Sequence, residues 1–218
     1  MNEDIPFDQR IVEAKIRWAR AGRKPLPPEG STRRDRLPPG QHEAKGWPVL
    51  DLGIKPRVTR DSFRLEILGA CMHPSVFDWG NILELPQTEC VSDFHCVTTW
   101  STFDNHWAGV RFRDLCLKVL PTSDARFVTF TSSDNYTTNL PLEACVDDDV
   151  LLVHSWNGKP LDLDHGGPLR MIVPKRYAWK SAKWIKSIEF HAEDRPGFWE
   201  VRGYSNTAFP FDDDRFSS

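Results

Sequence analysis

The chain has 218 residues, of which 39% are hydrophobic and 27% are charged, and its formal net charge is -3. This composition predicts an ordinary soluble globular protein, and the negative charge argues against a general binder of nucleic acid or of membrane surfaces, because either function needs a concentrated positive field. The five cysteines form no CxxC pair, so they indicate neither a disulfide framework nor a zinc ribbon.

Residues 1–40 are expected to form an N-terminal helix followed by a basic arm rich in proline. An apolar stripe with helical spacing runs through residues 8–21, with Asp8 as the expected N-cap and Gly22 as the stop. The prolines between residues 23 and 40 exclude a helix interior or a central strand there. The basic residues of this region could dock a partner, but a solvated helix face and a charged arm wrapped on the domain are the simpler interpretation.

Residues 41–218 are expected to form a single strand-rich α+β domain. Apolar and polar residues alternate with a period of two at 63–68, 127–131 and 185–190, as expected of strands. Asn157 and Gly158 predict a hairpin turn, because both tolerate positive φ. Residues 111–120 carry a helical apolar stripe, and the acidic residues 212–214 are expected to be a solvated end.

Cys96, in the run DFHCVTTWS at 93–101, is the main candidate for a functional residue. A thiolate is a good ligand for soft or high-valent metals, whereas a hydrolytic cysteine needs a base within hydrogen-bond reach. His95 is a poor base for it, because neighbours in an extended strand point to opposite faces. A cysteine-nucleophile hydrolase would need another histidine. The sequence does not choose among His42, His106, His154 and His165.

Several short motifs follow one another along the chain: FHCV at 94–97, WAGV at 107–110, LPL at 140–142, HGGPLR at 165–170 and KSAKW at 180–184. In this order and at these spacings, the chain resembles the molybdopterin-binding domain of the sulfite oxidase family, particularly the short bacterial sulfite oxidase-like oxidoreductases. The resemblance covers roughly residues 37–215. It implies a sulfite oxidase-type molybdopterin-binding fold with a deep pterin cleft, with the N-terminal helix packed outside, and molybdenum-molybdopterin as the cofactor.

The resemblance also implies roles for individual residues. Cys96 matches the molybdenum-ligating cysteine, and Tyr204 falls where sulfite oxidases carry an active-site tyrosine, so both are expected to be catalytic. The segment that holds the pterin phosphate is matched by Ser181, Ala182 and Lys183. Further cofactor contacts are expected at His42, Ser132, His165 and Arg170. Lysine and arginine suit a phosphate, because they bind it through charge-assisted hydrogen bonds.

The implied function is that of a molybdenum-dependent oxidoreductase that transfers an oxygen atom to or from a small oxyanion or a sulfoxide-type substrate. Sulfite is not implied, because residues 98–102 lack the Asn-Arg-Arg run that animal and plant sulfite oxidases carry after the metal cysteine. An external electron carrier is expected, without nucleic-acid or membrane partners. Unpaired cysteines and the lack of an apolar export signal favour the cytoplasm. The alternative function is a non-catalytic strand-rich binding or scaffold module with the same fold.

Overall fold

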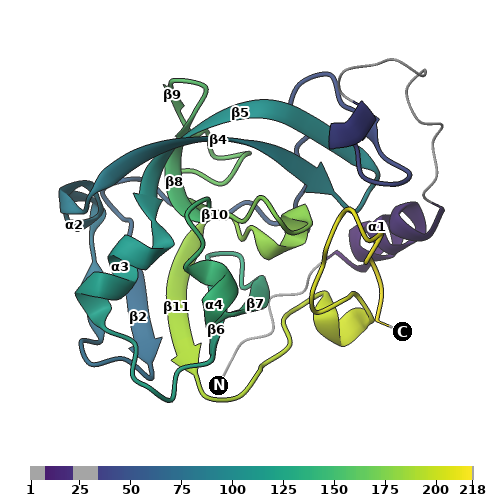
Figure 1. Cartoon of the computed structure of the whole chain (residues 1–218). Coiled ribbons are helices and arrows are strands. Elements are labelled where there is room, and N and C mark those ends of the chain that lie inside the picture. Colours follow the sequence, from purple (N-terminus) through teal and green to yellow (C-terminus); the bar gives the residue numbers. More distant parts are fainter. Residues whose placement is uncertain (1–7, 22–33, 218) are drawn as a thin grey trace.

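Two β-sheets form most of the protein (Figure 1), of which the computed structural model describes residues 8–21 and 34–217. One sheet consists of β1 (His42–Glu43), β4 (Gln87–Cys96), β5 (Trp100–Arg111), β8 (Leu151–Trp156), β9 (Lys159–Pro160) and β10 (Arg170–Ile172). The other consists of β2 (Leu65–Gly69), β3 (Ser75–Phe77), β6 (Phe127–Ser132), β7 (Thr137–Pro141) and β11 (Ile185–His191). The expected strand-rich α+β architecture is confirmed.

Short helices lie between some of the strands and at both ends of the described chain. The α-helices are α1 (Gln9–Ala21), α2 (Trp79–Glu84), α3 (Phe112–Val119) and α4 (Leu142–Cys145), and the 3₁₀ helices are η1 (Arg34–Arg36), η2 (Ala178–Lys180) and η3 (Glu200–Arg202). The helix expected at 111–120 is α3, and its apolar stripe is buried as predicted. None of the helices in the described part of the chain combines the length and the hydrophobicity that a membrane span requires.

All three strands predicted from alternation belong to the second sheet and are confirmed. Residues 63–68, 127–131 and 185–190 correspond to β2, β6 and β11, and β11 lies between the other two. The physical cause of the alternation is visible in β2, where Leu65 and Ile67 are fully buried and Glu66 between them is exposed. This sheet therefore buries one face against the core.

A long hairpin of β4 and β5 arches over the top of the molecule in Figure 1 and carries Cys96 at its end. Cys96 is the last residue of β4 and pairs with Trp100, the first residue of β5. The connecting turn is closed by the Thr99 amide, which donates to the Cys96 carbonyl at 3.0 Å. The hairpin turn predicted at Asn157 and Gly158 is also confirmed, with φ of 49° and 73° between β8 and β9.

At the first end of the described chain the expected helix cap is confirmed, whereas the last residues differ in part from expectation. Asp8 does cap α1, since its carboxylate accepts a hydrogen bond from the Arg10 amide at 2.9 Å, whereas Gly22 and the arm through residue 33 lie outside the described residues. The prediction that residues 212–214 form a solvated end is correct for Asp212, which is exposed, but wrong for Asp213 and Asp214, which are half-buried and hydrogen-bonded. Asp214 accepts hydrogen bonds from the Thr207 hydroxyl and the Phe209 amide, and Asp213 pairs with Arg215 at 2.7 Å, because this buried arginine requires a carboxylate.

Candidate active site

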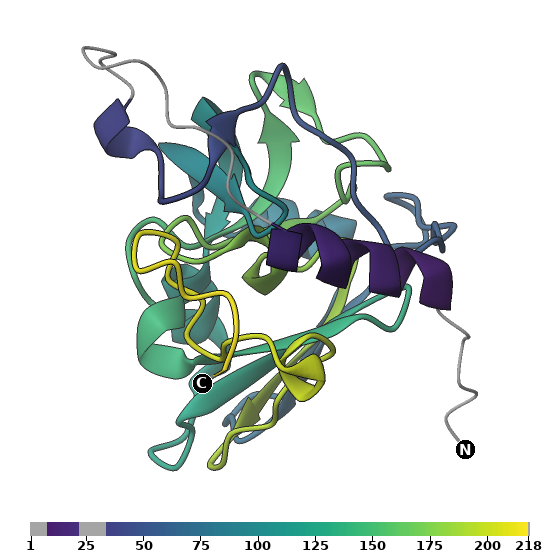
Figure 2. The same cartoon turned by 90° about the vertical axis from the view of Figure 1, so that its right-hand side faces the viewer.

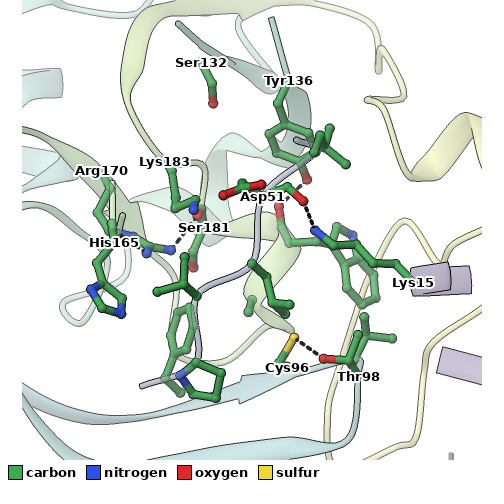
Figure 3. Close-up of a pocket in the computed structure, with 18 of the residues that line it drawn as sticks. Lys15, Asp51, Cys96, Thr98, Ser132, Tyr136, His165, Arg170, Ser181 and Lys183 are labelled. Atoms are coloured by element: carbon green, nitrogen blue, oxygen red, sulfur yellow. Dashed lines mark hydrogen bonds between the residues drawn. The ribbon is translucent and has the colours of Figure 1, made fainter. Parts of the chain in front are cut away.

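A pocket whose wall contains Cys96 gathers side chains that lie far apart in the sequence (Figure 3). The turn after β4 contributes Cys96 and Thr98, and the end of β6 contributes Ser132. Arg170 comes from the start of β10, and Lys183 follows η2. The pocket therefore lies where both sheets and the segment after η2 meet.

Cys96 is buried, with 6% of its surface exposed, and its Sγ lies 3.1 Å from the Thr98 hydroxyl. Burial raises the pKa of this thiol. His95 projects elsewhere, as predicted: its Nδ1 lies 2.8 Å from the Ser101 hydroxyl, and its ring packs against Phe211. In the part of the chain that the structure describes, no histidine forms a hydrogen bond with Cys96 Sγ. The described residues therefore provide no histidine as the general base that a cysteine-nucleophile hydrolase requires.

Arg170 is a buried cation, only 4% exposed, and its guanidinium makes hydrogen bonds only to backbone carbonyls among the residues described. Nη1 donates to His165 at 2.8 Å and Nη2 donates to Ser181 at 2.9 Å. No carboxylate of residues 8–21 or 34–217 forms a salt bridge with it, and burial lowers its pKa to about 9. A buried charge without a counter-ion is unfavourable, so this position suits an anionic ligand.

Lys183 provides a second cation on the same side of the pocket. Its Nζ donates to the Asp164 carbonyl at 2.9 Å and lies 4.1 Å from the centre of the Trp184 ring. Burial and the nearby Arg170 lower the pKa of Lys183 to about 7. Gly166 allows the two cations to approach, because a Cβ there would lie 3.0 Å from Lys183 and 3.1 Å from Arg170, and its φ of +103° disfavours other residues.

His165 is fixed in the pocket wall by contacts to both of its ring nitrogens. Nδ1 lies 2.9 Å from an Asp162 carboxylate oxygen, and Nε2 lies 3.0 Å from the Trp47 carbonyl oxygen. The ring also stacks on the Trp47 indole with 4.4 Å between centroids. These contacts hold the imidazole in one orientation beside Arg170.

Tyr204 and Ser132 each carry a buried hydroxyl in this pocket that forms no hydrogen bond with any described residue. Tyr204 is 2% exposed and packs between Trp179 and Trp199, with ring centroids at 5.2 Å and 4.8 Å. Burial raises the pKa of Tyr204, and Cys96 raises it further. A hydroxyl hidden from solvent favours a ligand role over that of a surface aromatic.

Two of the expected cofactor contacts are not in the pocket wall, namely Ala182 and His42. Ala182 is buried, and its carbonyl accepts a hydrogen bond from the Met171 amide, whereas its neighbour Ser181 does line the pocket. His42 lies on β1, one residue after Gln41, whose side chain donates to the Cys96 carbonyl at 3.0 Å. Neighbours in an extended segment point to opposite sides, so Gln41 takes the position beside the cysteine.

Some polar residues of the pocket were not identified from the sequence, among them Lys15, Asp51 and Asp134. Asp134 follows Ser132 by two residues just after the predicted strand, and this proximity was the available signal. Lys15 comes from α1, whose position over the pocket nothing in the sequence specified. This helix was expected to pack outside the cleft and to present a solvated basic face. Both expectations are wrong for Lys15, which lines the pocket.

Residues 52–199 of the chain match the protein family described as "Oxidoreductase molybdopterin binding domain". This chain belongs to that family. An uncharacterized oxidoreductase of Bacillus subtilis, YuiH, is 38% identical over 193 residues, which are 86% of this chain and 98% of the relative. The protein-methionine-sulfoxide reductase catalytic subunit MsrP of Campylobacter jejuni is 30% identical, over 68% of this chain and 55% of that subunit.

A solved structure with a similar fold is the sulfane dehydrogenase SoxCD from Paracoccus pantotrophus. It superposes with a TM-score of 0.59 at 20% identity, covering 64% of this chain and 40% of that one. The likeness confirms the sulfite oxidase-type fold expected of this family member. The family match likewise confirms an oxidoreductase domain with molybdenum-molybdopterin as its cofactor.

The pocket fits this cofactor in the chemistry of its groups. The cofactor needs a thiolate for molybdenum, cations for a terminal phosphate and hydrogen-bond donors for the pterin. Cys96 is the thiol in the pocket wall, and Arg170 and Lys183 are cations that form no salt bridge with any described residue. The hydroxyls of Ser132 and Tyr204 form no hydrogen bond in the described chain. These five residues are among the nine that the sequence assigned to cofactor binding and catalysis.

The lowered pKa of Lys183 predicts that the cofactor-free protein binds anions more tightly at low pH than at high pH. A lysine with a pKa of about 7 is charged below that pH and neutral above it. Sulfate keeps its charge in this range, so its dissociation constant is expected to rise about tenfold between pH 6 and pH 8. Isothermal titration calorimetry would measure this change, and Lys183→Met should flatten it. A wild-type affinity that does not change with pH would contradict this role for Lys183.

Proposed function

We propose that this protein transfers an oxygen atom to or from a small oxyanion or a sulfoxide-type substrate. The observation that carries the proposal is that Cys96 and the unpartnered, buried hydroxyl of Tyr204 face the same pocket. The sulfoxide reductase among the relatives supports a substrate of this chemical class. A scaffold that had lost its chemistry would have no need for a buried thiol and two buried cations in one cavity.

Some residues of the pocket would hold the cofactor, and others would bind the substrate. The bound cofactor supplies a metal that exchanges an oxygen atom and two electrons with a substrate. Cys96 would hold that metal, and Arg170 and Lys183 would hold the phosphate. The Tyr204 hydroxyl stays protonated, since burial raises its pKa, and it would therefore donate a hydrogen bond to a substrate oxygen. The aromatic walls of Trp179 and Trp199 would exclude water.

We also propose that an external carrier exchanges electrons with this site and that the protein works in the cytoplasm. The described cysteines, Cys71, Cys90, Cys96, Cys116 and Cys145, are all free. Free thiols are typical of a reducing compartment. The carrier would exchange electrons with the metal one at a time, and reduction of the purified enzyme by candidate carriers would identify it.

Cofactor loading provides the direct test of this function. The protein is expressed in cells that make molybdopterin, purified, and assayed for molybdenum by mass spectrometry and for released pterin by fluorescence. We expect both in stoichiometric amounts, together with oxygen-atom transfer by the purified enzyme. A well-folded sample with neither metal nor pterin, from cells in which an MsrP control loads normally, would refute the proposal.

A further inference from the structure

Helix α1 lies on the face turned toward the viewer in Figure 2, and its Lys15 lines the pocket. At its start, the Asp8 amide donates to the Leu52 carbonyl at 3.4 Å. Near its end, the buried Arg215 donates to the Ala19 carbonyl at 3.3 Å, while Asp213 pairs with the same arginine. Val12 and Ala19 are buried on the docked face. The helix therefore has a defined position, held by the segment after Asp51 and by the C-terminal turn.

Lys15 extends from α1 into this pocket and is largely buried there (Figure 3). Its Nζ donates a hydrogen bond to the Asp51 carbonyl. Within residues 8–21 and 34–217, no carboxylate forms a salt bridge with it. An ammonium group has three N–H donors, so Lys15 retains donors for a further acceptor. Burying a lysine is unfavourable without such an acceptor, and burial accordingly lowers its pKa.

Lys15 is separated from the cations assigned to the cofactor phosphate. Figure 3 shows Arg170, His165 and Lys183 together on one side of the pocket, with Lys15 entering from the other. Lys15 nevertheless lines the same pocket as Cys96. Residues 97–101, which follow Cys96, carry no charge of their own. Among the residues described, Lys15 is the only lysine or arginine of the pocket wall that is not assigned to the phosphate.

We propose that Lys15 is the substrate-binding cation of this site and that the substrate is an anionic oxygen compound rather than a neutral sulfoxide. The inference rests on the proposed function and narrows its substrate class. Lys15 would donate a charge-assisted hydrogen bond to an anionic oxygen and hold the substrate beside Cys96. Residues 52–199 define the family match, so this cation comes from a segment outside it.

The test uses the molybdenum-loaded enzyme, in which the cofactor's own phosphate would occupy Arg170 and Lys183. Sulfate serves as the anionic probe, and dimethyl sulfone serves as a neutral probe of similar shape. Binding is followed by tryptophan fluorescence, because Trp100, Trp179 and Trp199 line the pocket. The wild-type enzyme is expected to prefer sulfate, and Lys15→Met should weaken sulfate binding about tenfold or more without changing the affinity for the sulfone.

Two variants serve as controls for charge and for the helix. Lys15→Arg keeps the charge and should restore most of the sulfate affinity. Arg17→Met removes an exposed charge from the same helix, where Arg17 pairs with Glu13 at 3.9 Å, and it should leave sulfate affinity within about twofold of wild type. Molybdenum content should stay unchanged in all three variants.

Other outcomes separate this inference from the proposed function. A wild-type protein that takes up no molybdenum would overturn the proposed function, and this inference with it. A loaded enzyme that binds sulfate and the sulfone equally, or whose sulfate affinity survives Lys15→Met, would overturn the inference alone. Loss of molybdenum in Lys15→Met would also overturn it, since Lys15 would then hold the cofactor and not the substrate.

Discussion

Cys96→Ser is expected to abolish turnover and to remove the thiolate-to-molybdenum absorption while leaving the fold intact. Serine differs from cysteine by one atom, and its hydroxyl can keep the contact that Cys96 Sγ makes with Thr98 at 3.1 Å. A neutral hydroxyl is nevertheless a poor replacement for a soft thiolate as a metal ligand. Absorption spectroscopy, metal analysis and circular dichroism of the purified variant would measure the three properties.

Cys90→Ser provides a matched control for this variant. Cys90 lies on the same strand, β4, but outside the wall of the Cys96 pocket, and it is also a free thiol. The control should retain molybdenum, absorption and turnover. Normal activity and an unchanged absorption spectrum in Cys96→Ser would show that the metal is not bound through this sulfur.

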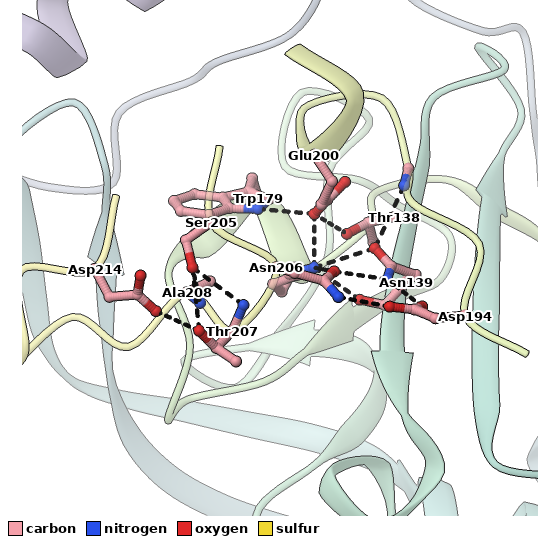
Figure 4. Close-up of polar contacts among 12 residues, drawn as sticks. Thr138, Asn139, Trp179, Asp194, Glu200, Ser205, Asn206, Thr207, Ala208 and Asp214 are labelled. Atoms are coloured by element: carbon pink, nitrogen blue, oxygen red, sulfur yellow. Dashed lines mark hydrogen bonds and ion pairs between the residues drawn. The ribbon is translucent and has the colours of Figure 1, made fainter. Parts of the chain in front are cut away.

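Lys180→Met is expected to lower the free energy of unfolding by about 3–5 kcal/mol, because it leaves a buried carboxylate without its counter-ion. Lys180 Nζ lies 2.6 Å from Glu200 Oε1, and the two side chains are 0% and 2% exposed. The same oxygen accepts hydrogen bonds from the Trp179 indole at 3.0 Å and the Thr138 hydroxyl at 3.2 Å (Figure 4). Since Trp179 lines the pocket, this network also positions part of its wall.

Urea unfolding followed by tryptophan fluorescence would measure this loss. Lys175→Met is the matched control, since Lys175 pairs with Asp147 at 2.8 Å, but the two side chains are 58% and 42% exposed. An exposed pair contributes little, so the control should lose at most about 1 kcal/mol. The double variant Lys180→Met with Glu200→Gln should recover part of the stability, because no buried charge remains unpaired. Equal stability of Lys180→Met and Lys175→Met would disprove the structural role of this pair.

Local patterns in the sequence were sufficient for some elements of the fold. The period of two at residues 63–68 and the apolar stripe at 111–120 follow from the geometry of a strand and of a helix, so β2 and α3 were predictable without tertiary information. Asp213 and Asp214 were wrongly predicted to be solvated, because the pairing of Asp213 with the buried Arg215 depends on the folded chain.

The candidate site was predictable where a motif fixed the residue and unpredictable where side-chain direction mattered. Cys96, Arg170 and Lys183 stand in ordered motifs, and the structure brings all three into one pocket. His42 does not line the pocket, and the neighbouring Gln41 bonds the Cys96 carbonyl, since successive side chains of an extended chain point in opposite directions. His42 and Ala182 remain predictions as cofactor contacts.

The sequence by itself determined the family and the strand-rich fold and singled out the thiol of Cys96, because these depend on residue order and local periodicity. Only the tertiary structure decided that Arg170 has no carboxylate partner among the described residues, that the Tyr204 hydroxyl is buried and that Lys15 reaches the pocket from α1. Burial and pairing depend on which distant segments pack together, and this long-range packing leaves no local periodicity in the sequence.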